Sequence, residues 1–208
     1  MLPETSAART QPARRWRRLL STVVRLLLLV TAGAMAGGMH GARAQTEPPS
    51  EYQVKAAFLY NFVKFVEWPV DTFADPGAPF VLGVLGEDPF GSVLEQTLKG
   101  KTVNGRALVI RGVKQGKDLR TCHILFVSSS EIRHLDQILE SLKGSSVLTV
   151  GEMERFAQSG GAVNFVLEQN RVRFEINPEA AARARLRISS KLLALARIVA
   201  DERREGKS

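Results

Sequence analysis

The residues able to carry out chemistry are few and widely spaced in this chain of 208 residues. Beyond residue 44 it holds two histidines, His123 and His134, and one cysteine, Cys122. Neither histidine has a second histidine four residues away or a carboxylate pair at metal-ligand spacing. The serines at Ser128–Ser130 and Ser189–Ser190 lack the glycine-flanked turn of a hydrolase nucleophile. The sequence therefore predicts a protein that is not an enzyme, with no metal site and no cofactor.

The turn Gly86–Gly91, GEDPFG, is the best candidate for a small-molecule site. It follows the apolar run Phe80–Leu85, and Asp88 with Pro89 is typical of a helix cap followed by a first helical residue. Backbone amides at such a junction can bind anions, but Glu87 and Asp88 place negative charge there, and no phosphate-loop or dinucleotide fingerprint is present. A crevice for a small, non-phosphorylated ligand stays open, lined by Gly86, Asp88 and Gly91.

Two groups of residues suit a protein partner. The segment Glu51–Pro69 predicts an aromatic helix that packs its Phe58 face on the core and leaves other side chains for contact: Tyr60, Asn61, Lys64 and Trp68. The predicted strand Arg171–Ile176 alternates apolar residues with polar ones, which form a second group with a later arginine: Arg171, Arg173, Glu175 and Arg187. An arginine row can hold a carboxylate or an acidic surface. The alternatives are core packing for the aromatic residues and an unpartnered, solvated face for the arginines.

The N-terminus predicts export. Arginines at positions 14–18 precede the apolar run Leu26–Val30, small residues and Ala42-Arg43-Ala44, so residues 1–44 are interpreted as a signal peptide that is cleaved after Ala44. An uncleaved membrane anchor is the alternative, although Arg25 interrupts the apolar stretch. Residues 1–44 hold seven of the 29 Lys and Arg and one of the 21 Asp and Glu, so the mature chain carries 22 basic and 20 acidic residues. This near balance argues against a nucleic-acid partner, which an exported protein rarely meets.

The order of elements predicts one domain. We expect a short flexible lead at residues 45–50, a single domain over residues 51–200 and a charged tail at residues 201–208. Strands and helices alternate early, tight turns are expected at Asn104-Gly105 and Gln169-Asn170, and a helix with Leu192 and Leu195 on one face starts near Ser190. These patterns predict an α/β layered domain with a central mixed, mostly parallel sheet of five or six strands, flanked by helices on both faces.

Cys122 directly precedes the apolar run HILFV, which is typical of a buried strand, and is expected to be a buried core thiol rather than a catalytic or redox one. As the only cysteine it cannot form an intramolecular disulfide, and only an exposed Cys122 would allow a covalent dimer.

The ordered set of motifs resembles the YfiR family of bacterial periplasmic proteins, also described as YfiR/HmsC-like. The resemblance is carried by KAAFLYNFVKFVEWP at Lys55–Pro69, GVLGEDPFG at Gly83–Gly91, CHILFVS at Cys122–Ser128, VLTVGE at Val147–Glu152, and RVRFEINPEAA with LRISSKLLALARIV. This chain differs from better-known members of the family in its cysteines. Several cysteines form disulfides in those members, whereas Cys122 is the only cysteine at a matching position in this chain.

This resemblance implies a non-catalytic periplasmic regulator. Such a protein holds an inner-membrane diguanylate cyclase inactive by contacting its periplasmic sensory domain, which lowers cyclic di-GMP and biofilm formation. The resemblance further implies an outer-membrane lipoprotein antagonist and a domain that can form a homodimer. The alternative function is a periplasmic small-ligand-binding protein that feeds a sensor or transporter and uses the crevice at Gly86–Gly91 together with the strand of Arg171 and Arg173.

Overall fold

The computed structural model of the protein describes residues 48–114, 116 and 118–202. The predicted signal peptide lies outside the described residues, as do half of the predicted lead and most of the predicted tail. No helix in the described part is long and apolar enough to cross a membrane.

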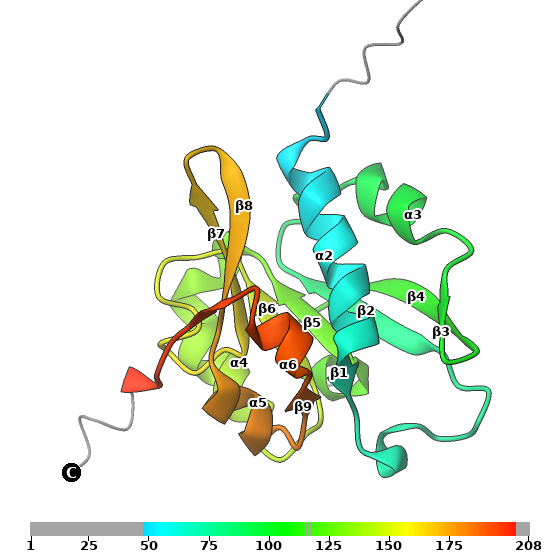
Figure 1. The fold of residues 1–208 in the computed structure, drawn as a ribbon. Helices are drawn as coiled ribbons and strands as arrows, with labels where there is room; N and C mark the ends of the chain where they lie inside the picture. Colours follow the sequence, from blue (N-terminus) through cyan, green and yellow to red (C-terminus); the bar gives the residue numbers. More distant parts are fainter. Residues whose placement is uncertain (1–47, 115, 117, 203–208) are drawn as a thin grey trace, which may run out of the picture. The chain divides into compact units, whose positions relative to one another are not determined.

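A mixed, mostly parallel sheet of eight strands forms the centre of the domain (Figure 1). Its strand order is β10-β8-β7-β6-β5-β2-β4-β3, and only the β3–β4 and β7–β8 pairs are antiparallel. The strands are β2 (Phe80–Leu85), β3 (Thr102–Val103), β4 (Arg106–Val113), β5 (Ile124–Val127), β6 (Leu148–Gly151), β7 (Val163–Glu168), β8 (Arg171–Ile176) and β10 (Arg197–Ile198). The predicted fold class is confirmed. The strand count is higher than predicted because β3 and β10 have two residues each, too few to produce a periodic pattern.

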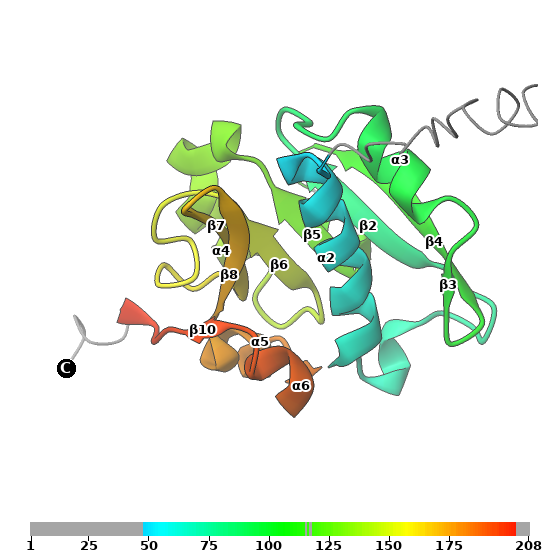
Figure 2. The same ribbon diagram turned by 45° about the horizontal axis from the view of Figure 1, so that its top comes forward.

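Helices cover both faces of this sheet. On β5, Ile124 and Phe126 belong to one buried cluster, while Leu125 and Val127 belong to a second cluster on the opposite face. The first cluster packs against helices α2 (Glu51–Phe65), α3 (Ser92–Leu98), α5 (Pro178–Arg183) and α6 (Ser190–Leu193), and the second against α4 (Leu135–Ser141). Figure 2 shows α2 lying across the central strands. Burial on both faces explains why β2 and β5 are continuous apolar runs.

Helix α2 begins with a capping box. The Ser50 hydroxyl accepts from the Gln53 amide and the Gln53 side chain accepts from the Ser50 amide, so the fold starts at the last residue of the predicted lead. The helix ends at Phe65, before Trp68 and Pro69, and Val66–Glu67 form β1, which pairs with β9 (Arg187–Ile188).

Three local predictions are wrong. Asp88 and Pro89 do not begin a helix, because the Asp88 carboxylate accepts from the Phe90 amide to form a turn, and α3 starts only at Ser92. The predicted helix near Ser190 ends at Leu193, so Leu195 is 69% exposed and the chain continues into β10. The first residues of the predicted tail are held in the fold: buried Asp201 pairs with Arg183, and the Glu202 amide donates to the Gln158 carbonyl.

Both predicted tight turns are confirmed. Asn104 and Gly105 join β3 to β4, and Gln169 and Asn170 join β7 to β8, with positive φ at all four residues. Two consecutive residues of positive φ are typical of the two-residue turn whose twist matches the flanking strands. The second of these turns forms the tip of the β7–β8 hairpin.

Candidate functional site

The predicted partner-binding residues of the first helix are half-buried, apart from Lys64, and contact the domain itself. The Tyr60 hydroxyl donates to the Thr102 carbonyl of β3 at 3.4 Å, and its ring faces the ammonium of Lys101. Asn61 is half-buried, and Lys64 is exposed with its ammonium over the Tyr60 ring. These contacts place Tyr60 and Lys64 near the β3 end of the sheet.

Trp68 joins the exit of α2 to the sheet. Its indole Nε1 donates to the His123 carbonyl at 3.3 Å, and its ring packs edge-on against Phe80. These contacts are the ones expected if Trp68 packs on the core. A partner-binding role for Trp68 stays a prediction.

The arginine row divides into two places. Arg187 lies on β9 and pairs loosely with Glu67 of β1 at 3.8 Å, whereas Arg171 and Arg173 lie on β8, near the other end of the large sheet. Arg171 and Arg173 are exposed, and neither forms an ion pair with any described residue. The predicted partner-binding residues therefore do not form one patch, and only this pair offers free positive charge on the hairpin.

The β7–β8 hairpin extends beyond its neighbouring strand (Figure 1). Strand β6 pairs only with Val163 and Asn164, whereas β7 and β8 stay paired up to Glu168 and Arg171. The outer half of the hairpin is therefore a two-stranded ribbon that carries Arg171 and Arg173 away from the sheet.

Glu175, which the strand alternation placed on the exposed polar face, is instead buried, with 2% of its surface accessible. The expected exposure is wrong because β10 lies beside β8 and brings Arg197 opposite Glu175. Arg197 Nε donates to Glu175 Oε1 at 3.0 Å, its Nη2 makes a second contact with the same oxygen, and its Nη1 donates to Glu168 at 3.1 Å.

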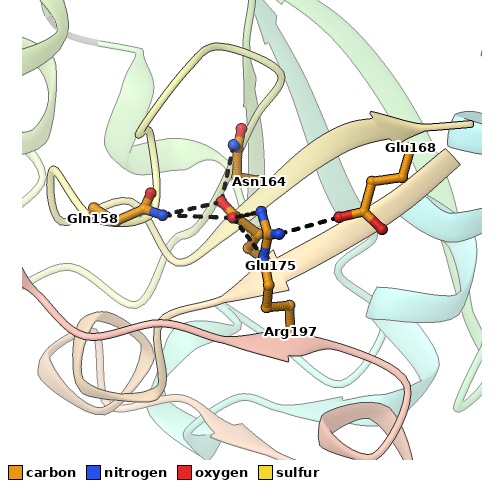
Figure 3. Close-up of polar contacts among 5 residues, drawn as sticks. All are labelled: Gln158, Asn164, Glu168, Glu175 and Arg197. Atoms are coloured by element: carbon orange, nitrogen blue, oxygen red, sulfur yellow. Dashed lines mark hydrogen bonds and ion pairs between the residues drawn. The ribbon is translucent and has the colours of Figure 1, made fainter.

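Two amide side chains complete this Glu175 network, which Figure 3 shows. Asn164 Nδ2 donates to Glu175 Oε2 at 3.3 Å, and Gln158 Nε2 approaches both carboxylate oxygens at 3.5 Å. Hydrogen bonds to Glu175 and its charge raise the pKa of Arg197, so the guanidinium stays charged. The sequence did not predict Gln158, Asn164 or Arg197 as members of this network. Arg197 reaches Glu175 only through the two-residue strand β10, which gives no periodic signal.

A second buried ion pair lies under the start of α2. The helical spacing of Glu51–Pro69 places Lys55 away from the apolar face that holds Phe58, but in the structure Lys55 is buried. Its Nζ contacts Glu152 at 2.7 Å and Glu51 at 2.5 Å. Burial alone would lower the pKa of Lys55, but the hydrogen bonds and charges of Glu152 and Glu51 outweigh it and raise the pKa. Burial next to Glu152 also raises the pKa of Tyr52, whose ring faces the Lys55 ammonium.

The turn Gly86–Gly91 is internally bonded. The Glu87 amide donates to the Ser130 hydroxyl at 3.0 Å and the Phe90 amide to Asp88, so neither amide is available to a ligand. Gly86 has a φ of 88°, and a Cβ there would lie 2.4 Å from the Ser130 hydroxyl. An adjacent pocket of about 330 Å³ is bordered by three carboxylates, Glu87, Asp88 and Glu152, and contains neither Arg171 nor Arg173. A ligand role for Gly86, Asp88 and Gly91 stays a prediction. The three carboxylates of the adjacent pocket disfavour an anionic ligand.

Cys122 and His123, which lie just before β5, are buried and have structural roles. His123 Nδ1 accepts from the Val81 amide at 3.0 Å, and its ring stacks on Phe73. Burial, with a smaller effect of the Arg106 charge, lowers the pKa of His123 to about 4. Cys122 is buried against Gly83, as expected, and burial raises the pKa of its thiol, so the condition for a covalent dimer is not met.

His134 lies on the surface beside Glu131, with a distance of 3.3 Å between His134 Nδ1 and Glu131 Oε2. Among the described residues no group of three His, Cys, Asp or Glu side chains is placed to hold a metal ion.

The sequence model of one protein family, described as YfiR/HmsC-like, matches residues 52–197. The match begins in the first turn of α2 and ends at Arg197, so it includes the Lys55–Glu152 pair, the Glu175–Arg197 pair and the whole hairpin. The match covers more than two thirds of the chain. This protein belongs to the YfiR/HmsC-like family.

Proposed function

We propose that this protein is a periplasmic regulator that represses an inner-membrane diguanylate cyclase by binding the cyclase's periplasmic sensory domain. Membership of the YfiR/HmsC-like family is the observation that carries the proposal. The predicted signal peptide at residues 1–44 supports export, and the near-neutral mature chain suits a protein partner better than a nucleic acid. Repression would lower cyclic di-GMP and biofilm formation.

The repression requires no chemistry from this chain. A protein that binds the inactive arrangement of the cyclase more tightly than the active one shifts the population toward the inactive form. To move that population from 1:99 to 99:1, the preference must reach about 10⁴-fold. An outer-membrane lipoprotein antagonist would relieve repression by competing for the regulator, and a homodimer would present two copies of the binding surface.

The β7–β8 hairpin is the part of the fold best suited to the contact. Arg171 and Arg173 stand on a ribbon that extends past β6, and their guanidinium groups have no ion-pair partner in the described part of the chain. Guanidinium groups bind carboxylates in a two-pronged geometry, so an acidic surface on the sensory domain is the expected counterpart.

Deletion of the gene tests the proposal. The expected result is a rise in cellular cyclic di-GMP, reversed by the wild-type gene and dependent on one membrane-bound cyclase. Unchanged cyclic di-GMP in the deletion strain, with the cyclases of the cell shown to be functional, would disprove the repressor role. Copurification from detergent-solubilised membranes then identifies the cyclase, and a form of that cyclase lacking its periplasmic domain must fail to copurify.

A further inference from the structure

A pocket of about 380 Å³ lies where β7 runs past the end of β6. It is bordered by Glu152–Arg155, which follow β6, by Asn164–Leu167 of β7, and by the Glu175 network. Successive side chains of a strand point to opposite faces, so a pocket that touches four consecutive residues reaches the edge of the strand.

Two buried oxygen atoms in this pocket lack a hydrogen-bond donor. Asn164 is 1% exposed, and neither its Oδ1 nor the buried Oε1 of Gln158 has a hydrogen-bond partner among the described residues. The orientation of both amides is fixed chemically, because the Glu175 carboxylate only accepts hydrogen bonds and therefore faces their NH₂ groups. Figure 3 shows both oxygens turned away from Glu175. A buried acceptor without a hydrogen-bond donor destabilises the folded state. A ligand that supplies N–H groups to these two oxygens would therefore be stabilised by them.

The backbone of β7 offers further hydrogen bonds at the same place. The Asn177 amide donates to the Ala162 carbonyl at 2.9 Å, and bonded pairs recur at every second residue of an antiparallel ladder. Asn164, Val166 and Glu168 therefore direct their backbone groups to β8, while Leu167 directs its own to the opposite edge. Leu167 lies beyond the last β6 pairing and is 55% exposed, so the described fold gives its N–H and C=O no strand partner there.

The charges that border the pocket leave one carboxylate uncompensated. Glu152 is paired with Lys55, Arg155 with Glu202, and Glu175 with Arg197. Glu154 is exposed, and no described residue forms an ion pair with it. The pocket therefore combines one free negative charge with two orphan oxygens, an environment that favours a cationic N–H donor.

We propose that this pocket receives an extended segment of the partner protein, which pairs with the free edge of β7 and inserts a lysine or arginine side chain toward Asn164, Gln158 and Glu154. The inference rests on the proposed function and specifies the chemistry by which the regulator recognises its partner. A free amine would satisfy the amide oxygens but not the backbone of Leu167, whereas an added strand satisfies both.

Selection from a phage library of random eight-residue peptides against the mature protein tests this inference. Bound peptides are expected to share a lysine or arginine at one fixed position, and its replacement by methionine should weaken binding at least tenfold, measured by fluorescence anisotropy. The Leu167 amide should also exchange its hydrogen more slowly once the peptide is bound.

Two variants at one position separate the backbone from the side chain. Leu167→Pro removes the edge N–H and is tolerated on a free strand edge, so it should weaken peptide binding at least tenfold while thermal unfolding changes little. Leu167→Ala keeps the N–H and should have a much smaller effect. Glu154→Gln should weaken binding several-fold, because it removes the free charge from an exposed position and leaves the fold intact.

The proposal is overturned if no peptide is enriched, if the enriched peptides share no basic residue, or if Leu167→Pro binds them as tightly as the wild type. Free lysine or agmatine binding as tightly as the peptide would also overturn it, since the strand pairing would then contribute nothing. Its failure is distinguishable from failure of the repressor role. A Leu167→Pro protein that represses cyclic di-GMP fully in cells, where gene deletion raises it, would refute only the strand pairing.

Discussion

Two buried carboxylates of this domain differ in how their surroundings neutralise them. Glu152 meets a buried cation, Lys55, whereas Glu175 meets Arg197, whose side chain is 59% exposed, and two amides whose oxygens stay free. The first arrangement encloses its charges beneath α2, and the second lies at the base of a hairpin that extends past the sheet. Burial of a charge alone therefore does not identify a functional site. Unused hydrogen-bonding capacity and access for a partner distinguish the Glu175 network from the Lys55 pair.

The largest expected effect is on the enclosed pair. Lys55→Met should lower the free energy of unfolding by about 3–5 kcal/mol, because Glu152 is left buried without its cation. Urea unfolding followed by circular dichroism measures this change. Lys64→Met on the exposed face of the same helix is the control and should change stability by less than about 0.5 kcal/mol. If Lys55→Met lowered the free energy of unfolding by less than about 1 kcal/mol, the Lys55–Glu152 pair would be accessible to water. It would then not differ from the Glu175 network.

His123 extends the comparison to another enclosed group. Its folded pKa, about 4, lies below the unfolded value of about 6.5, so the unfolded state binds the proton more tightly. Stability should be intact above pH 6.5 and fall as the pH drops from 6.5 to 4, by at most about 1.4 kcal/mol per pH unit and about 3.4 kcal/mol in total.

Two histidine variants assign this pH dependence. His123→Asn places an oxygen near the position of Nδ1 and should flatten the slope, even if it lowers overall stability. His134→Gln replaces the exposed histidine and should change the free energy of unfolding at pH 7 by less than about 0.5 kcal/mol. A slope that persists in His123→Asn would assign the acid sensitivity to other groups.

The Glu175 network should be less sensitive than the Lys55 pair. Arg197→Met is expected to cost about 2 kcal/mol, because Glu175 keeps its amide donors and water can reach the place of the lost guanidinium. Urea unfolding measures this change, with Arg133→Met as the exposed control. A loss as large as that of Lys55→Met would show that both carboxylates are equally enclosed and would break the comparison.

The smallest effect on stability is expected at the hairpin arginines, together with the largest effect on function. Arg171→Ala combined with Arg173→Ala should change the free energy of unfolding by less than about 0.5 kcal/mol, since both side chains are exposed and unpaired within the described fold. Cyclic di-GMP in cells carrying this double variant should approach the level of the deletion strain.

A charge-matched control accompanies the hairpin variant. Arg111→Ala combined with Arg133→Ala removes two exposed positive charges elsewhere and should leave repression intact. Equal loss of repression in both double variants would indicate that overall charge, not the hairpin, governs the interaction.

The fold class could be predicted from the sequence because its signals are local and strong. The continuous apolar runs of β2 and β5, the turn residues at Asn104-Gly105 and Gln169-Asn170, and Asn177-Pro178 at the start of α5 each determine their own conformation. The alternation of apolar and polar residues along β8 correctly predicted that Arg171 and Arg173 are exposed.

The Glu175 network could not be predicted because it depends on contacts distant in sequence. Glu175 is buried only since a two-residue strand 22 positions later brings Arg197 over it. Lys55 likewise gave the pattern of a surface lysine on an amphipathic helix, and only the fold places Glu152 next to it, 97 positions away. Ion pairs of this kind follow from topology, which single-residue patterns do not encode.

The burial of Cys122 gives the protein a natural reporter of its own opening. As the only thiol of the chain, packed against Gly83 in a buried cluster with Leu119, it can react with a thiol reagent only when a local opening of the fold exposes it. The labelling rate of the unmodified protein thus measures the free energy of that opening, and a partner that stabilises the native state will slow it. Candidate partners can therefore be compared by chemical protection, without a tag or an introduced dye.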